Sequence, residues 1–445
     1  MQHSAPVEDR TLTLAELAQH DGRDGTYWLE IHGEVYDVTE FLPGHPGGSI
    51  LKLGAGRHST VLFESYHPGP ALDRALRVLK RRAVHVGSLA PAEREPYGDP
   101  TFFHAVRSRV DALLRERGLR YHSRAWLVHL EVVLLPLLFV AAWAARTWQG
   151  SYLAAAVGGI LLARMGFVMH SGNHAALSRK AWPNALAGSL MDFIGGSSLV
   201  WKSEHQYSHH GRPNVLGLDN DCQIGTPLLR FHPGLERRWW HRIQSVGLGV
   251  GMSVGLVKWI VTDFKYALRG RVTHVSLRVD RREWIRLLGF KTLWVVMHLV
   301  VPIIVAGPMF ALLSAFVMLA VGAYYMEGIF IVNHLQRDLV PEPDVHWSVQ
   351  QIQGSANWAA GSQWANVVSG SLNHQVEHHL FPTMSPYLYP VIVPVVRRTC
   401  EEFGLRYRDF SGFASAMMGT IAYLNELGRP EPGSSPTPAT APMPR

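Results

Sequence analysis

Two pairs of long apolar segments constrain the fold of this chain more than any other feature. The first pair covers residues 126–148 and 152–169, and the second covers residues 287–306 and 308–332. A helix of about 20 apolar residues crosses a hydrocarbon core of about 30 Å while satisfying its own backbone hydrogen bonds. Only the short turns QGS and GP separate the members of each pair. We therefore predict two helical hairpins, and thus four transmembrane helices, in an all-α membrane domain.

The composition agrees with a membrane protein that functions in a reducing environment. Charged residues make up 17% of the chain, against about 25% in ordinary soluble domains. Cys222 and Cys400 are the only cysteines, which argues against a disulfide framework and a cysteine-based zinc site. The net charge of +7 suits anionic lipid or an acidic partner. Because no basic-aromatic nucleic-acid motif accompanies this charge, we expect no nucleic-acid partner.

Positive charges indicate how the four helices are oriented. Arginines cluster at 115–124 before the first helix, seven Lys and Arg residues lie within 265–286 before the third, and the hairpin turns carry at most Arg146. By the positive-inside rule, both termini and both basic regions face the cytosol. Residues 244–260 are apolar but Gly-rich and interrupted by Lys258, and a span there would place a later histidine cluster across the membrane. We predict that this segment lies at the membrane interface.

The chain divides into four predicted parts. Residues 8–88 have the short β-like runs, helical stretches and turn sequences of a small α+β domain. Residues 89–124 combine a Pro-rich linker with an amphipathic, interfacial helix, for which packing on protein is the alternative. Residues 125–426 form the membrane domain. The tail, 427–445, is rich in Pro, Ser and Thr and is predicted to be disordered.

Three histidine clusters follow predicted spans or the apolar segment between them. They are His170 and His174; His205, His209 and His210; and His378 and His379, which Gln375 precedes by three residues. In an α-helix, residues four apart share a face, so His205 and His209 would point together and His210 would lie about 100° away. One such pair alone is more often a surface or capping pair. Three of them beside hydrocarbon favour a metal site, since all-imidazole ligation suits a first-row metal.

Two further histidines lie in the N-terminal part. His45 and His67 are 22 residues apart, each in an apolar, Gly- and Pro-rich setting, and the sequence Pro-Gly-Gly directly after His45 predicts a tight turn. A six-coordinate haem needs two neutral imidazoles on opposite walls of an apolar slot. On spacing alone, the alternative is that both are ordinary histidines flanking a hydrophobic run.

The N-terminal part resembles the cytochrome b5 family over residues 10 to 88. The resemblance rests on His45-Pro-Gly-Gly, the following Ala-Gly turn, and His67 in FESYHPG. It implies that His45 and His67 are the axial ligands of haem b. The family usually has an acidic residue where this chain has His58, and that residue helps to form an acidic surface for docking an electron-transfer partner. The resemblance therefore implies an altered docking contact.

The remainder resembles the membrane fatty acid desaturase superfamily over residues 99 to 427. The resemblance rests on the patterns HxxxH, HxxxHH and QxxHH in this order around two membrane hairpins. It implies a histidine-rich di-metal cap on the cytosolic side that holds two iron ions. Redox-inert zinc could not supply the O₂-derived oxidant that an unactivated C–H bond requires. The implied ligands are His170, His174, His205, His209, His210, His378 and His379, with His334 in FIVNHLQRD at the end of the fourth span.

The sequence allows more than one role for each of three residues near the predicted ligands: Gln375, His374 and Glu327. Gln375 stands where most desaturases have a histidine, which marks the front-end branch and implies an outer-shell role or a weak ligand. His374 is a ligand, an outer-shell base or a packed ring. Glu327, two helical turns before His334, orients a ligating imidazole or pairs with Arg164.

The two resemblances together imply a front-end fatty acyl desaturase. Such an enzyme inserts a cis double bond between an existing double bond and the carboxyl end of a polyunsaturated fatty acyl chain, at the delta-4, 5 or 6 position. It would use O₂ and electrons that a cytochrome b5 reductase-like flavoprotein delivers through the haem domain. Its substrate would be a fatty acyl-CoA or acyl-lipid, in the endoplasmic reticulum membrane. A sphingolipid long-chain-base delta-8 desaturase and a fatty acyl hydroxylase would use the same ligands. A non-catalytic haem-bearing membrane protein is the further alternative.

Overall fold

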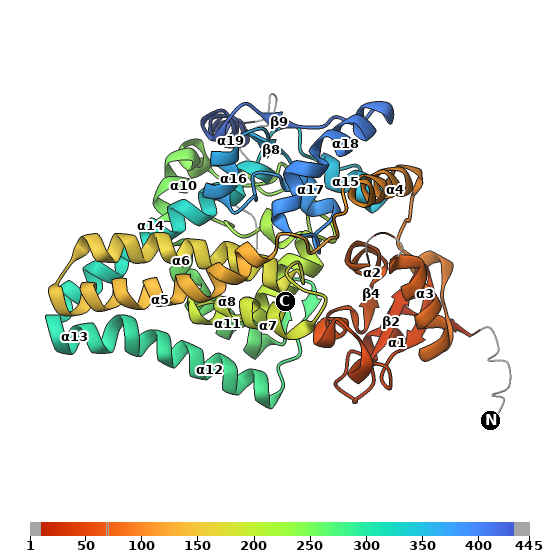
Figure 1. Cartoon of the computed structure of the whole chain (residues 1–445), viewed down its shortest axis with the longest axis horizontal. Coiled ribbons are helices and arrows are strands. Elements are labelled where there is room, and N and C mark those ends of the chain that lie inside the picture. The colour runs from red at the N-terminus through yellow and green to blue at the C-terminus, as the bar shows by residue number, and fades with distance from the viewer. Residues whose placement is uncertain (1–9, 68, 70, 431–445) are drawn as a thin grey trace.

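The computed structural model describes residues 10–67, 69 and 71–430. An N-terminal α+β domain packs against a larger helical domain, and the N-terminal domain lies at one end of the molecule (red, Figure 1). The predicted fold class is confirmed: a small α+β unit precedes a domain with four long apolar helices. Of the predicted disordered tail, residues 431–445 lie outside the described residues.

The N-terminal domain is built on a five-stranded sheet with the order β1-β5-β3-β2-β4. The antiparallel hairpin of β2 and β3 pairs Leu29 with Tyr36, and both side chains enter a small core with Leu79 of α3. Its elements are β1 (Thr11–Leu12), α1 (Leu14–Gln19), β2 (Trp28–Ile31), β3 (Glu34–Asp37), η1 (Leu42–Gly44), η2 (Gly48–Gly54), β4 (Arg57–His58), α2 (Thr60–Tyr66), α3 (Ala71–Arg82) and β5 (Val84–Leu89).

The connection to the helical domain packs on protein. It contains η3 (Pro91–Glu93) and α4 (Thr101–Glu116). The apolar stripe of α4, including Phe102, Val106 and Val110, is buried in one cluster with Ile392 and Val396 of α18 (Tyr389–Glu402). This is the second of the two arrangements that the amphipathic pattern allows.

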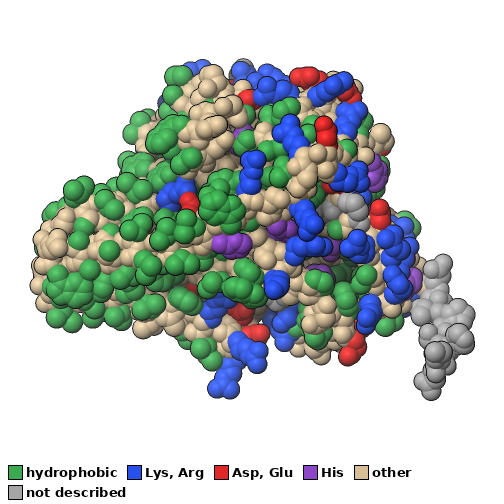
Figure 2. Space-filling model, in the orientation of Figure 1, with side chains coloured by type: hydrophobic (Ala, Val, Ile, Leu, Met, Phe, Trp, Pro, Cys, Tyr) green, Lys and Arg blue, Asp and Glu red, His purple; other side chains and the backbone are tan. Residues whose placement is uncertain are grey.

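Four helices are long and apolar enough to cross a membrane, as predicted. They are α5 (Trp126–Gln149), α6 (Tyr152–Asn173), the continuous run Arg281–Ala306, and α14 (Pro308–His334). The run Arg281–Ala306 comprises α12 (Arg281–Val295), a π-helical turn η7 (Val296–Val300) and α13 (Val301–Ala306). Apolar side chains cover the end of the molecule that these helices form, whereas Lys and Arg gather over the opposite end (Figure 2). The chain is thus an integral membrane protein.

The apolar segment between the two hairpins is bent. It forms η6 (Trp239–Ile243), α10 (Gln244–Met252) and α11 (Gly255–Arg269), and the two stretches Trp239–Met252 and Gly255–Arg269 meet at 82°. Among the described residues the count of candidate spans would rise to five only if this bent pair were one span. The interfacial location of this segment stays a prediction.

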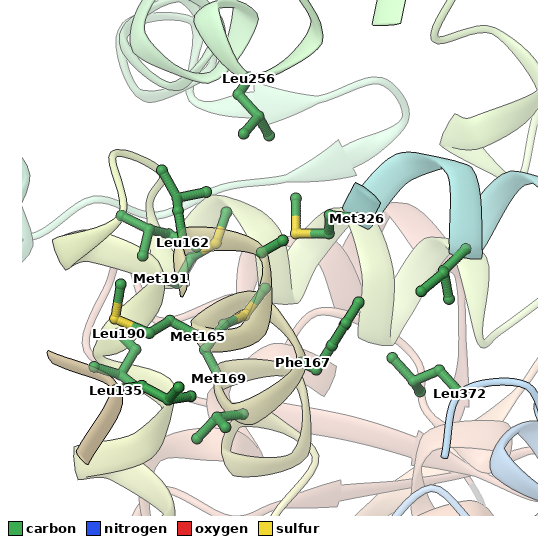
Figure 3. Close-up of a cluster of buried hydrophobic side chains, with 14 of the residues drawn as sticks. Leu135, Leu162, Met165, Phe167, Met169, Leu190, Met191, Leu256, Met326 and Leu372 are labelled. Carbon is green, nitrogen blue, oxygen red and sulfur yellow. The ribbon is translucent and has the colours of Figure 1, made fainter. Parts of the chain in front are cut away.

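The core of the helical domain lies where α6 packs against α14. A Cβ atom on Gly159 would lie 2.3 Å from the carbonyl oxygen of Met318, so only glycine lets the two backbones approach this closely. Figure 3 shows Leu162, Met165 and Met169 of α6 beside Met326 of α14. This packing fixes the ends of α6 and α14 against each other, and both ends carry histidines.

Shorter elements complete the histidine-rich side of this domain. They are α7 (Ala181–Gly188), α8 (Leu190–Phe193), α9 (Ser198–Trp201), the π-helix η4 (Lys202–His209), η5 (Asn220–Cys222), β6 (Arg271–Val272), β7 (Val275–Ser276), α15 (Trp347–Gln353), β8 (Asn357–Trp358), α16 (Gln363–Ser369), α17 (Gln375–Leu380), η8 (Pro386–Leu388), β9 (Asp409–Phe410) and α19 (Phe413–Leu427).

Candidate metal centre and haem site

Four segments that are distant in sequence bring eight histidines together. The end of α6 supplies His170 and His174, η4 and the residue after it supply three, the end of α14 supplies His334, and α17 supplies two. Their nitrogen atoms form two groups within which all lie within 4.8 Å of one another. The first group is His170, His174, His205, His210 and His378, and the second is His209, His334 and His379. All eight histidines named from the sequence are therefore in one place.

The second histidine cluster is built on a π-helix. The backbone N–H of His210 donates to the carbonyl oxygen of His205 at 2.9 Å, a bond between residues five apart. This spacing places His205 and His210 in the same group, while His209 joins the other. The rings of His205 and His209 stack with centroids 5.2 Å apart, so these two residues share a face as predicted. The prediction that His210 is turned about 100° away from His205 was wrong, because it assumed 3.6 residues per turn.

The distances within the first group suit shared ligation. Nε2 of His170 lies 3.0 Å from Nε2 of His205, and Nε2 of His378 lies 3.0 Å from Nε2 of His210. Nitrogens that share a metal at about 2.0–2.1 Å lie at comparable separations. Nε2 of His174 and Nε2 of His379 are buried without a hydrogen-bond partner among the described residues. These orphaned nitrogens and the all-imidazole donor set fit two first-row metal ions, one for each group.

The other ring nitrogens are held by a layer of hydrogen bonds. Nδ1 of His334 donates to the carbonyl oxygen of Gly354 at 2.9 Å, and Nδ1 of His379 donates to Oε1 of Gln351 at 2.6 Å. Such partners fix the tautomer and aim Nε2 at the metal. Nδ1 of His378 lies 3.1 Å from the Tyr389 hydroxyl. None of these partners was identified from the sequence, because each comes from a different segment and no spacing rule relates it to its ring.

Among the eight histidines of the described structure, His209 is the one whose ring contacts carboxylates. Its Nδ1 lies 3.0 Å from Oδ2 of Asp219 and 3.4 Å from the more exposed Asp221. Burial lowers the pKa of His209, but the Asp219 carboxylate outweighs burial and raises this pKa to about 9. Asp219 is fully buried and also accepts the backbone N–H of Asn214 at 2.7 Å, so the site fixes its position. No spacing pattern in the sequence relates Asp219 to His209, so this partner was not predicted.

The rings of the first group are kept neutral. Burial, reinforced by neighbouring histidines, lowers the pKa of His205, His210 and His378 well below the usual value. A neutral imidazole has a lone pair available for a metal.

The three ambiguous positions have distinct environments. Nε2 of Gln375 lies 3.1 Å from Nε2 of His334, so the amide touches the second group. His374 belongs to neither group, and its Nε2 bonds instead to Oδ1 of Asn366 at 2.8 Å. Arg164 pairs with Glu131, not with Glu327. Glu327 faces Gly255 of α11, where an added Cβ would lie 2.1 Å from its Oε1.

The N-terminal histidines also form a site. The ring centroids of His45 and His67 are 6.2 Å apart, close to the separation of two imidazoles that share one metal ion at about 2 Å. Nδ1 of His67 donates to the carbonyl oxygen of Phe63 at 2.7 Å. A Cβ on Gly47 would lie 2.8 Å from Cε1 of His45, so the Pro-Gly-Gly turn makes room for this ring. Burial lowers the pKa of both rings, to about 4 for His67, so both are neutral. These features fit haem.

The two sites meet at the domain interface. The hydroxyl of Tyr66, the residue before His67, lies 2.8 Å from Nδ1 of His174. Arg57 donates to the carbonyl oxygen of Ser276 at 2.8 Å. The Tyr207 hydroxyl donates to the carbonyl oxygen of His58 at 2.9 Å. The position where an acidic docking residue was expected therefore faces the chain's own helical domain.

Comparison with known proteins agrees with both halves of this description. The family model "Fatty acid desaturase" matches residues 146–411, more than half of the chain. The chain belongs to the fatty acid desaturase family. The model "Cytochrome b5-like Heme/Steroid binding domain" matches residues 13–90 of this desaturase. Both predicted resemblances are thus confirmed, and the protein is a membrane oxidoreductase.

Several relatives match this desaturase over nearly its whole length. An acyl-lipid (8-3)-desaturase of Physcomitrium patens is 29% identical over 96% of this chain and 94% of its own. An acyl-lipid (8-3)-desaturase of Mortierella alpina is also 29% identical, over 95% and 98%. A chloroplastic acyl-lipid (7-3)-desaturase of Chlamydomonas reinhardtii is 31% identical over 89% and 80%.

Proposed function

We propose that this desaturase is a front-end enzyme. It inserts a cis double bond between an existing double bond and the carboxyl end of a polyunsaturated fatty acyl chain. It uses O₂ and electrons relayed from its own haem b to two iron ions. The names of the near-full-length relatives support an acyl-lipid substrate.

The observation that carries the proposal is the contact between Tyr66 and His174. Tyr66 is covalently next to the haem ligand His67, and His174 belongs to the first metal group. The hydrogen bond of 2.8 Å therefore connects the two redox sites through one side chain. A domain fused for electron delivery requires such a connection.

The residues of the site have different roles: some bind the metals and others position the metal ligands. When bound, haem supplies one-electron transfer and iron supplies activation of O₂. The eight histidines hold the metals, and Gly354, Gln351 and Asp219 hold the rings in position. Gln375 occupies the edge of the second group as an outer-shell group or weak ligand. Six of the eight histidines are at most 4% exposed, so the protein shields the chemistry from bulk water.

The same proposal includes the electron donor, the orientation in the membrane and the acyl carrier. Electrons enter from a cytochrome b5 reductase-like flavoprotein. The N-terminal domain, the metal groups and both termini face the cytosol, because the basic regions flank the spans on that side. The membrane is that of the endoplasmic reticulum, and the acyl carrier is a lipid or CoA.

Expression in yeast fed linoleic and dihomo-γ-linolenic acids tests the proposal. We expect a new acyl chain with one additional double bond nearer the carboxyl end, identified by lipid profiling. His45→Ala and His379→Ala should each abolish the product. His104→Ala, a substitution of an exposed histidine on α4, is the matched control and should retain it.

Other products would contradict the proposal. A hydroxylated acyl chain or an unsaturated sphingoid base would replace the front-end assignment by one of its rivals. Unchanged product in His45→Ala would remove the haem domain from the electron route. Haem without further iron, together with no product, would indicate a non-catalytic protein.

A further inference from the structure

A cationic pocket lies beside the second histidine cluster. It has a volume of about 340 Å³ and lies between α11 and the segment around η5. Four cationic side chains line it, namely Lys258, Lys265, Arg269 and Arg271. Its other lining residues are Asn220, Gln223, Ile224, Thr226, Thr262, Tyr266 and Thr273, so it has no carboxylate in its wall.

Three of the four cationic residues lie on one face of helix α11. Lys258, Lys265 and Arg269 are separated by seven and four residues, which places them on one face of the helix. The apolar residues Val261 and Leu268 of the same helix are 67% and 76% exposed. An exposed apolar face beside a cationic one is typical of a helix that lies in the interface of a membrane. The pocket thus opens at the depth of lipid head groups.

In the described part of the chain, none of the four cations contacts a carboxylate directly. Lys265 lies over the ring of Tyr266, 5.8 Å from its centroid, and Lys258 interacts with the buried carboxylates of Glu204 and Glu327 from beyond ion-pair distance. Within residues 10–67, 69 and 71–430, none of their side chains makes a hydrogen bond or an ion pair with another residue. By contrast, Lys291 of α12 pairs with Asp263 of α11 at 2.6 Å. Four unpaired cations around a pocket with hydroxyl groups form a binding site for an anion with several oxygens, such as a phosphate.

One residue in the wall of the pocket is hydrogen-bonded to the π-helix η4, which carries the second histidine cluster. Nδ2 of Asn220, a lining residue, donates to Oε1 of Glu204 at 3.0 Å. Glu204 is the residue before His205 of the first metal group. The pocket is therefore one side chain away from the second histidine cluster.

We infer that this pocket binds the phosphate of the acyl carrier, either a phospholipid head group or CoA. The inference rests on the proposed front-end function, because a free fatty acid would bring no phosphate. A front-end enzyme places its double bond by distance from the carboxyl end, where the carrier is attached. A carrier held next to His205 leaves only the first few carbons of the chain to reach the metals, and so fixes that distance.

Isothermal titration calorimetry on the full-length protein in neutral detergent tests the inference. The probes are dihexanoylphosphatidylcholine, coenzyme A and inorganic phosphate. The variant Lys265→Gln/Arg269→Gln removes two charges from the pocket. The control Arg281→Gln/Arg282→Gln removes two exposed charges at the start of α12, outside the pocket. Haem absorbance and metal content report whether each variant is folded.

We expect one of the two carriers to bind the wild-type protein, and its identity names the carrier. The pocket variant should weaken that binding by about tenfold or more, and the control by less than about twofold, because each lost contact is charge-assisted. Lys265→Arg should restore most of the affinity relative to Lys265→Gln.

Three results would overturn the inference: no binding of either carrier, binding of inorganic phosphate alone, or equal losses in the pocket variant and the control. Product analysis of the same preparations separates this failure from failure of the proposed function. A front-end product without carrier binding removes only the pocket, whereas carrier binding with a hydroxylated product removes only the front-end assignment.

Discussion

The indole N–H of Trp347 in α15 donates a hydrogen bond of 2.6 Å to the carboxylate of Glu64 in α2. The Tyr97 hydroxyl donates to the same carboxylate at 2.6 Å, and Nε2 of His32 lies 2.9 Å from it. Glu64 is only 2% exposed and stands three residues before His67. One buried carboxylate thus joins the haem domain, the linker and the helical domain, and it holds α2 in the position that lets Tyr66 reach His174.

Replacement of Glu64 should loosen this docking. Glu64→Ala leaves the buried Trp347 indole unpaired, at a cost of about 1–3 kcal/mol, and also removes the acceptor of the more exposed Tyr97 hydroxyl. We expect a lower thermal unfolding temperature and faster proteolysis within residues 90–100, with haem content unchanged. Glu34→Ala is the control, because Glu34 pairs with His85 inside the haem domain. Equal effects of the two variants would show that Glu64 has no special role in docking.

The docking should be insensitive to mild acid. Burial alone would raise the pKa of Glu64, but hydrogen bonds from His32, Tyr97 and Trp347 hold it well below its usual value of 4.5. A carboxyl with a depressed pKa stabilises the folded state fully above the unfolded pKa and loses this contribution as the pH falls below it. His346, 3.6 Å away, also faces this carboxylate. Linker proteolysis should stay constant from about pH 7 to about pH 5 and rise only below about pH 4.5 in wild type. A rise already at about pH 6 would contradict this assignment.

Tyr66→Phe should slow electron delivery while leaving both sites assembled. The substitution keeps the ring but removes the hydroxyl that contacts His174, and loss of such an outer partner typically costs about 10–100-fold in activity or metal affinity. The measurement is the rate of haem re-oxidation after reduction, together with metal content and product yield. Tyr207→Phe is the matched control, because it removes a hydroxyl that bridges the domains without contacting a histidine ring. If both variants re-oxidise at the wild-type rate, the contact is not part of the route.

Asp219→Asn should weaken the second metal group. An amide cannot stabilise a ring as a carboxylate does, so we expect about 10–100-fold weaker metal retention at His209, His334 and His379. Metal analysis after dialysis against a chelator gives the measurement, and haem absorbance should not change. Asp221→Asn is the control, because its side chain is 48% exposed and lies farther from His209. Greater metal loss in Asp221→Asn than in Asp219→Asn would reverse the assignment.

Much of this protein could be predicted from local patterns. The lengths of the apolar segments predicted all four membrane helices to within a few residues at most boundaries, because a span must be both long and apolar. Histidine spacing identified seven of the eight residues that meet, since imidazoles beside hydrocarbon have few roles other than function. The eighth, His334, was identified only through the resemblance to the desaturase superfamily. His45 and His67 were recognised through the resemblance to the cytochrome b5 family, since their spacing alone left ordinary histidines as the alternative.

The tertiary structure decided how these residues are arranged. The π-helix regrouped His205 with His210, because one extra residue per turn changes which side chains share a face and no local propensity signals it. Asp219, Gln351 and Tyr66 reach their imidazoles from segments whose approach depends on the packing of the whole domain. The sequence by itself thus determined the membrane helices and the identity of the histidines, through length, hydropathy, residue type and family resemblance. The partition into two groups, their outer hydrogen bonds and the contact between the two redox sites required the fold, because these contacts join residues far apart in the chain.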